Sequence, residues 1–142
     1  MIPKEQEQIQ KVKIAFASKD NIHINQHFGW CEMFYIYEIL EDDYTLVNEV
    51  DSSLKFENEV EKLEYKISCL EDSDIVYVSQ IGPKAANMVK QCGIYPIKSS
   101  NDDGATSQAG GQKIDNVIIS IQKLMKNNPP LWLKRILMKG SR

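Results

Sequence analysis

The alternation of apolar and polar residues in the first third of the chain predicts three β-strands. Residues 12–18 form an apolar segment typical of a buried strand, and a polar loop at residues 20–26 separates it from a second strand predicted over residues 30–40. Residues 44–50 predict a third strand, with a turn at the acidic residues 41–43, so the three strands should form an antiparallel meander. One face of the second strand is expected to carry Cys31, Met33, Tyr35, Tyr37 and Ile39.

A helix is predicted next, because apolar residues recur at steps of three and four. Ser52 or Ser53 is expected to cap its N-terminus. Its apolar stripe consists of Phe56, Val60, Leu63, Ile67 and Leu70. Residues 75–78 then form a short, continuous apolar run, which is typical of a strand covered on both faces.

The following segment alternates helix and strand. Gly82 and Pro83 should begin a second helix, with proline at its first position, and Gly93 should end it. Residues 94–97 predict a fifth strand parallel to the fourth, because strand–helix–strand units form right-handed parallel crossovers. A third amphipathic helix should stop at residues 127–130, and its apolar stripe is Ile114, Val117, Ile118, Ile121, Leu124 and Met125.

Residues 131–138 predict a short C-terminal helix that docks through Trp132 and Ile136. The order of elements predicts the α/β class, with a mixed five-stranded sheet, three main helices and this short C-terminal helix. Three antiparallel strands followed by helices that alternate with two more strands are close to a ribonuclease H-like layout.

Length and charge are those of an ordinary globular domain. The chain has 142 residues, enough for one hydrophobic core, and residues 12–138 should form a single domain. Residues 1–11 read as a flexible polar leader, and the polar, glycine-rich residues 99–111 predict a mobile loop. The net charge of −3 argues against a general nucleic-acid binder, and no segment approaches the roughly 20 apolar residues of a membrane span.

Cysteine use limits the metal chemistry. Cys31, Cys69 and Cys92 are an odd, widely spaced set, which fits a reducing cytoplasm better than a disulfide framework. A protein-held iron–sulfur cluster normally takes four cysteines, and the CxxC pair of a structural zinc site is absent. The cysteines alone therefore do not supply a self-contained metal site.

The stretch His27-Phe28-Gly29 is the strongest candidate for chemistry. A neutral imidazole at a strand-to-strand corner, beside a glycine that lets backbone come close, suits a soft or borderline metal. His23 and Cys31 lie four residues to either side, roughly 13 Å away on a straight strand. Two interpretations stay open: a mononuclear His-His-Cys site formed by chain reversals, or a solvated His23, a Cys31 packed in the core and a His27 that caps or hydrogen-bonds.

Residues 81–84 are a second candidate, for anion binding. A helix that starts just after a strand offers free backbone N–H groups near Gly82, and Lys84 adds a positive charge. Together with Lys19 and Lys98, these residues would give a modest positive rim to an otherwise acidic protein. The alternative is a plain, well-capped helix.

A ribonuclease H-like layout also raises a nuclease interpretation, which requires several carboxylates to hold two divalent ions. Asp20, Asp51 and Asp74 lie near the ends of predicted elements. However, residues 13–18 of the first strand contain no acidic residue, and such sites usually start on that strand. The sequence therefore disfavours a nuclease.

Several short motifs, in their order and spacing, resemble the dinitrogenase iron–molybdenum cofactor biosynthesis family. These motifs are residues 13–18, Asp20, Ile24, His27-Phe28-Gly29, and residues 74–78, 81–85 and 92–97. The ending, residues 128–133, looks like the NifX type of that family. The resemblance extends from Val12 to Leu137, although the family's loop is usually shorter than residues 99–111.

This resemblance implies a ribonuclease H-like fold without nuclease activity. It further implies a cytoplasmic carrier that binds the iron–sulfur precursor or the finished iron–molybdenum cofactor and transfers it among nitrogenase cofactor assembly proteins. By the resemblance, His27 of the His27-Phe28-Gly29 motif contacts the cluster. Cys31 lies outside the family motif, and its position two residues after Gly29 makes it a second candidate ligand. Gly82 and Lys84 would support the negative charge of the cargo. A cluster brings its own sulfides, so a carrier needs only one or two soft ligands and some cations.

Two alternatives to the carrier stay open at this stage. One is a metal-dependent hydrolase or nuclease of the ribonuclease H type. The other is a docking protein for nitrogenase assembly partners that uses the tail at residues 129–132. The oligomeric state is open between a monomer and a homodimer, and neither nucleic acid nor a membrane is expected as a partner.

Overall fold

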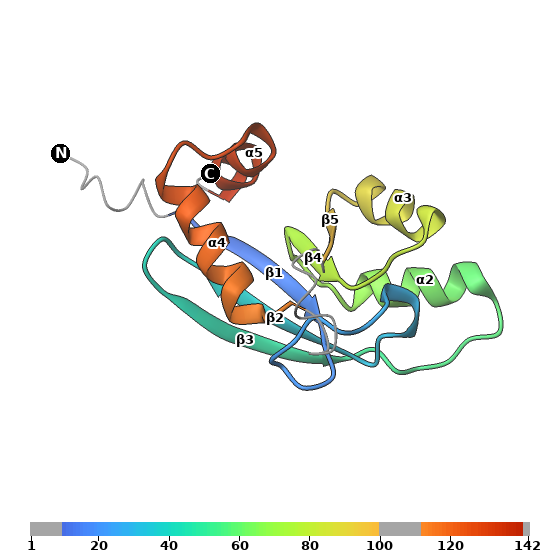
Figure 1. Cartoon of the computed structure of the whole chain (residues 1–142). Helices are drawn as coiled ribbons and strands as arrows, with labels where there is room; N and C mark the ends of the chain where they lie inside the picture. The colour runs from blue at the N-terminus through green and yellow to red at the C-terminus, as the bar shows by residue number, and fades with distance from the viewer. Residues whose placement is uncertain (1–9, 100–111, 141–142) are drawn as a thin grey trace.

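A five-stranded sheet forms the centre of the molecule, with the strand order β3-β2-β1-β4-β5. The computed structural model describes residues 10–99 and 112–140 (Figure 1). Strand β2 pairs antiparallel with β1 and β3, whereas β4 runs parallel to β1 and β5. The prediction of a mixed α/β sheet that begins with an antiparallel meander is therefore confirmed. The strands are β1 Val12–Ala17, β2 Met33–Ile39, β3 Tyr44–Asp51, β4 Ile75–Val78 and β5 Tyr95–Lys98.

Helices cover both faces of this sheet (Figure 1). Ile14 and Phe16 of β1 pack in one core with helices α4 and α5. Ala15 and Ala17 point the other way and pack in a second core with α2 and α3, because successive strand residues face opposite sides. The helices are the short 3-10 helix η1 Phe28–Trp30, followed by α2 Glu59–Ser68, α3 Pro83–Gln91, α4 Ile114–Lys126 and α5 Leu131–Gly140.

The second strand starts later than the sequence suggests, at Met33 instead of residue 30. The chain first makes the turn η1, in which the Trp30 N–H donates to the His27 carbonyl at 3.1 Å. This turn shifts the alternation that an extended strand would keep. Cys31 therefore does not share a face with Tyr37 and lies in the core under α2 and α3 instead.

Helix α2 also starts later than expected, and neither Ser52 nor Ser53 is its cap. Asn58 caps the helix, because its side-chain oxygen accepts from the Glu61 N–H at 3.0 Å. Ser52 is buried, and its hydroxyl donates to the Cys31 carbonyl at 2.7 Å. It therefore links the segment after β3 to the segment after η1.

The ends of the later helices follow the sequence prediction closely. Gly82 precedes Pro83 at the start of α3, and Gly93 follows its end with a φ of 83°, a conformation that favours glycine. The C-terminal helix α5 packs on the sheet as expected, with Trp132 stacked on Tyr95 at a centroid distance of 4.6 Å.

Parts of two predicted segments, residues 1–9 of the leader and residues 100–111 of the long loop, lie outside the described residues. Within the described ranges, no helix has the length and apolar character that crossing a membrane requires.

Candidate functional site

Two loops meet at the carboxyl ends of β1 and β4, and this contact builds the His27 corner. Because these strands are parallel, their following loops leave the same edge of the sheet. The Phe28 N–H donates to the Gln80 carbonyl at 2.8 Å, and the Ser79 N–H donates to the Gln26 carbonyl at 3.0 Å. Phe28 is fully buried, whereas His27 is exposed. The buried phenylalanine and the backbone bonds thus hold the neighbouring imidazole in solvent.

An open groove of about 590 Å³ lies beside His27. The imidazole stacks against Trp30 with ring centroids 4.9 Å apart and an angle of 9° between the rings. Trp30 itself is 72% exposed, so both rings are available to a ligand. The groove is lined by His27, Gly29, Trp30, Glu59, Lys62, Gln80, Ile81, Gly82 and Pro83.

The structure brings the predicted His27, Gly29 and Gly82 together in this groove, although Gly82 is separated from them by more than fifty residues in sequence. Helix α3 starts at the groove wall with no side-chain cap, so its N-terminal backbone N–H groups supply partial positive charge there. Lys84 is exposed but does not line the groove, and neither do Lys19 and Lys98.

Lys62 is the cation that the sequence analysis missed. Its Nζ lies 3.3 Å from Glu59 Oε1, and a Cβ added to Gly29 would lie 3.7 Å from that same nitrogen. In sequence it looks like any lysine on an exposed helix face. Only the packing of α2 against η1 reveals its place beside His27.

Cys31 is fully buried and is not among the groove-lining residues. Its thiol donates to the Met33 carbonyl, with 2.9 Å between Sγ and the oxygen. Burial raises the pKa of the Cys31 thiol to about 11, so at neutral pH it is protonated. The folded chain therefore does not present Cys31 as a thiolate beside His27, and a ligand role for it remains a prediction that requires the corner to open.

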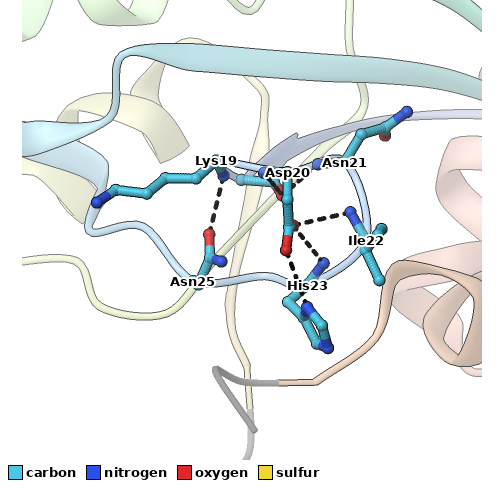
Figure 2. A network of polar contacts seen from close by, with 7 residues as sticks. Lys19, Asp20, Asn21, Ile22, His23 and Asn25 are labelled. Atoms are coloured by element: carbon cyan, nitrogen blue, oxygen red, sulfur yellow. Dashed lines mark hydrogen bonds and ion pairs between the residues drawn. The ribbon is translucent and has the colours of Figure 1, made fainter.

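His23 serves the loop between β1 and η1 instead of a metal site. Its Nδ1 lies 3.1 Å from Asp20 Oδ2, and its backbone N–H donates to Asp20 Oδ1 at 2.9 Å. Figure 2 shows how the Asp20 carboxylate also accepts from Ile22 while Asn25 accepts from the Lys19 N–H.

The electrostatics of Asp20 confirm its structural use. Burial alone would raise the pKa of this carboxyl, but hydrogen bonds from His23, Ile22 and Ser18 outweigh burial and hold the pKa well below its usual value. The charged carboxylate therefore stabilises the loop that leads to His27.

The other carboxylates considered for a nuclease are occupied in separate places. Asp74 accepts from the Lys13 N–H at 2.9 Å, and Asp51 accepts from the Ser53 N–H at 2.8 Å. Among the described residues, no three histidine, cysteine or acidic side chains gather in a group that would hold a metal ion. The tail proposed for docking uses Trp132 for internal packing against Tyr95.

Comparison with known proteins identifies relatives over most of the chain. The model of the family described as dinitrogenase iron-molybdenum cofactor matches residues 10–119. NifX of Herbaspirillum seropedicae is 28% identical over 131 residues, which cover 91% of this chain and 84% of that protein. NifX of Azotobacter vinelandii is 29% identical over 129 residues, which cover 90% of this chain and 76% of that protein.

A solved structure supports the fold. The crystal structure of PH0822 superimposes with a TM-score of 0.55 at 20% identity, covering 79% of this chain and 89% of that one. At this identity the likeness concerns the fold alone.

Proposed function

The chain belongs to the dinitrogenase iron-molybdenum cofactor family, of the NifX type, and we propose that it carries an iron–sulfur precursor or the finished iron–molybdenum cofactor as transient cargo. Membership assigns it a role in nitrogenase cofactor biosynthesis. In this proposal the protein catalyses no reaction and passes its cargo among cofactor assembly proteins in the cytoplasm. The ribonuclease H-like layout belongs to the proposal too, supported by the strand order and by the meander that precedes two parallel strands.

One observation carries the proposal: an exposed imidazole stands in an open groove with a cation and an uncapped helix start. His27, Lys62 and the Gly82 end of α3 line this groove together. The imidazole offers a ligand for iron or molybdenum, while the ammonium group and the helix N-terminus favour a negatively charged cluster. A groove open to solvent and a single exposed ligand suit a carrier, because the cargo must leave again.

Anaerobic titration with the isolated precursor or cofactor tests this proposal. Binding is measured by visible absorption and gel filtration. The His27→Ala variant should no longer bind the cluster stoichiometrically. The matched control is His23→Asn, which removes the other histidine of the chain and keeps an amide near Asp20. Binding should survive in the control. If His27→Ala binds as tightly as the wild type, His27 is not the ligand, and if the wild type itself binds no cluster, the carrier proposal fails.

A further inference from the structure

Lys66 is a buried cation that pairs with no carboxylate of the described residues. The residue is 4% exposed, and its Nζ donates to the carbonyls of Cys31 and Ser52, the latter at 2.7 Å. No acidic oxygen of the described residues lies within 4.0 Å of this nitrogen. Buried charges are normally paired, since a lone ion loses the solvation of water. Burial accordingly lowers the pKa of Lys66.

The hydrogen-bonding capacity of Lys66 is also incomplete. An ammonium group has three N–H donors, and two are used by main-chain carbonyls. Within the part of the chain that the structure describes, no acceptor takes the third. The group thus retains both a positive charge and a donor for an incoming acceptor.

Lys66 lines a second pocket, of about 330 Å³, between η1, α2 and the segment that follows β3. Lys55 and Lys62 line it as well, against a single acidic residue, Glu32. The pocket therefore has an excess of positive charge, although the whole chain has a formal net charge of −3. Such an arrangement attracts anions specifically to this place.

This pocket adjoins the His27 groove. Gly29, Trp30 and Lys62 line both hollows. Gly29 has no side chain to separate them, and Lys62 Nζ lies 3.7 Å from where a Cβ at Gly29 would stand. A single ligand with a metal cluster at His27 therefore has a positively charged pocket within reach.

We propose that the pocket of Lys55, Lys62 and Lys66 binds an oxyanion, a carboxylate or phosphate group, that belongs to the ligand contacted by His27. The inference rests on the proposed carrier function and adds a second recognition point to it. The cluster end is held by the imidazole and the oxyanion end by the lysines. A ligand with both ends is thereby preferred over a bare cluster.

Isothermal titration with citrate and with inorganic phosphate tests the pocket without any cluster. We expect saturable binding. In a parallel NMR titration, the same anions should shift the amide resonances of Gly29 and Lys66. Lys55→Met and Lys66→Met should weaken it by about tenfold or more, as expected for lost hydrogen bonds to a charged group. Lys55 is exposed, so its variant keeps the fold even if Lys66→Met does not. The matched control is Lys123→Met, an exposed lysine on α4 at the opposite face of the sheet.

A parallel titration with the isolated cofactor separates the sources of the anion. If free citrate and phosphate bind weakly or not at all, but Lys55→Met lowers cofactor affinity while Lys123→Met does not, the oxyanion is one carried by the cargo. If neither the free anions nor the cofactor distinguish Lys55→Met from Lys123→Met, the inference is overturned.

The two proposals fail in different ways. His27→Ala should abolish cofactor binding yet leave lysine-dependent citrate binding unchanged. Cofactor binding that depends on His27 and ignores the three lysines would remove the oxyanion pocket and keep the carrier. Lysine-dependent citrate binding with no cofactor binding by the wild type would remove the carrier, and would leave an anion pocket whose ligand is not the cargo.

Discussion

The position of His27 depends on its two neighbours in the turn η1. Phe28 is buried and fixes the backbone, while Trp30 is 72% exposed and stacks on the imidazole. The stacked indole limits the orientations of the imidazole ring and shields one of its faces. At the residue scale, the site is an exposed imidazole whose geometry is set by one buried and one exposed aromatic ring.

Trp30→Ala should therefore weaken cargo binding without destabilising the fold. Loss of a stacked ring corresponds to roughly 0.5–1.5 kcal/mol, or about a twofold to tenfold loss of cofactor affinity. Because the side chain is mostly exposed, the free energy of unfolding should change by about 0.5 kcal/mol or less. Anaerobic titration and chemical denaturation measure the two effects, and an unchanged affinity would remove Trp30 from the site.

The buried Cys31 thiol should make stability depend on pH in the alkaline range. Burial raises its pKa from 9.0 to about 11, so between these values the unfolded chain loses a proton that the folded chain keeps. The stabilisation is complete below pH 9.0 and is lost as the pH rises through about 11. It amounts to roughly 2–3 kcal/mol at most.

Denaturation of wild type and Cys31→Ala from neutral pH to about pH 11 measures this contribution. The variant should lose less stability with rising pH than the wild type. Parallel pH curves would mean that Cys31 is accessible as a thiolate in the folded chain, and would return it to the list of available ligands.

At the scale of elements, two glycines with different roles provide a matched pair. Gly93 ends α3 at a φ of 83°, where an L side chain is strained. Gly29 lies outside that region, and a Cβ there would meet Lys62 Nζ at 3.7 Å, an ordinary contact. Gly93 is thus required by the backbone, whereas Gly29 has an ordinary conformation and lines both the groove and the lysine pocket.

Gly93→Ala should lower the free energy of unfolding by about 1 kcal/mol or more. Gly29→Ala should change it by about 0.5 kcal/mol or less, because no strain is introduced. Chemical denaturation of both variants tests the contrast. A destabilisation by Gly29→Ala equal to that of Gly93→Ala would show that the turn η1 needs glycine for its own backbone.

Sequence patterns located the regular elements well and the joints between them poorly. The start of α3 was predictable because Gly82 and Pro83 specify a helix N-terminus locally. The turn η1 was not, because its first residue is held by a hydrogen bond from the Phe28 N–H to the carbonyl of Gln80, more than fifty residues away. Ser52 was mistaken for a helix cap because a free serine and a buried, bridging serine look alike in sequence.

In the candidate site too, residues with a local sequence signal could be predicted, and residues placed by distant contacts could not. His27 and Gly82 could be singled out because each has local chemistry, an imidazole at a corner and a helix start after a strand. Lys62 and Lys66 could not, because helix α2 carries lysines and glutamates alike, and only burial distinguishes Lys66 from a solvated lysine. The positions of these two lysines depend on tertiary packing, which is not apparent from the sequence.

At the scale of the whole molecule, the sheet order explains why the site lies where it does. Parallel β1 and β4 are neighbours at the centre of the sheet, so the loops that follow them converge at one edge. Open α/β sheets commonly bind ligands at the carboxyl ends of their strands. Helices α2 and α3 flank this edge and contribute Lys62 and the Gly82 helix start. The fold thus gathers an exposed imidazole, a lysine and a helix N-terminus at one place.

Direct detection of the bond between His27 and the cargo tests the central claim. The protein, grown with nitrogen-15 histidine, would be loaded anaerobically with the isolated cofactor in a paramagnetic state and measured by electron spin echo envelope modulation. Coupling to an imidazole nitrogen should appear in the wild type and in His23→Asn, and should vanish in His27→Ala. A cluster that binds stoichiometrically without imidazole coupling, or coupling that persists in His27→Ala, would contradict the account.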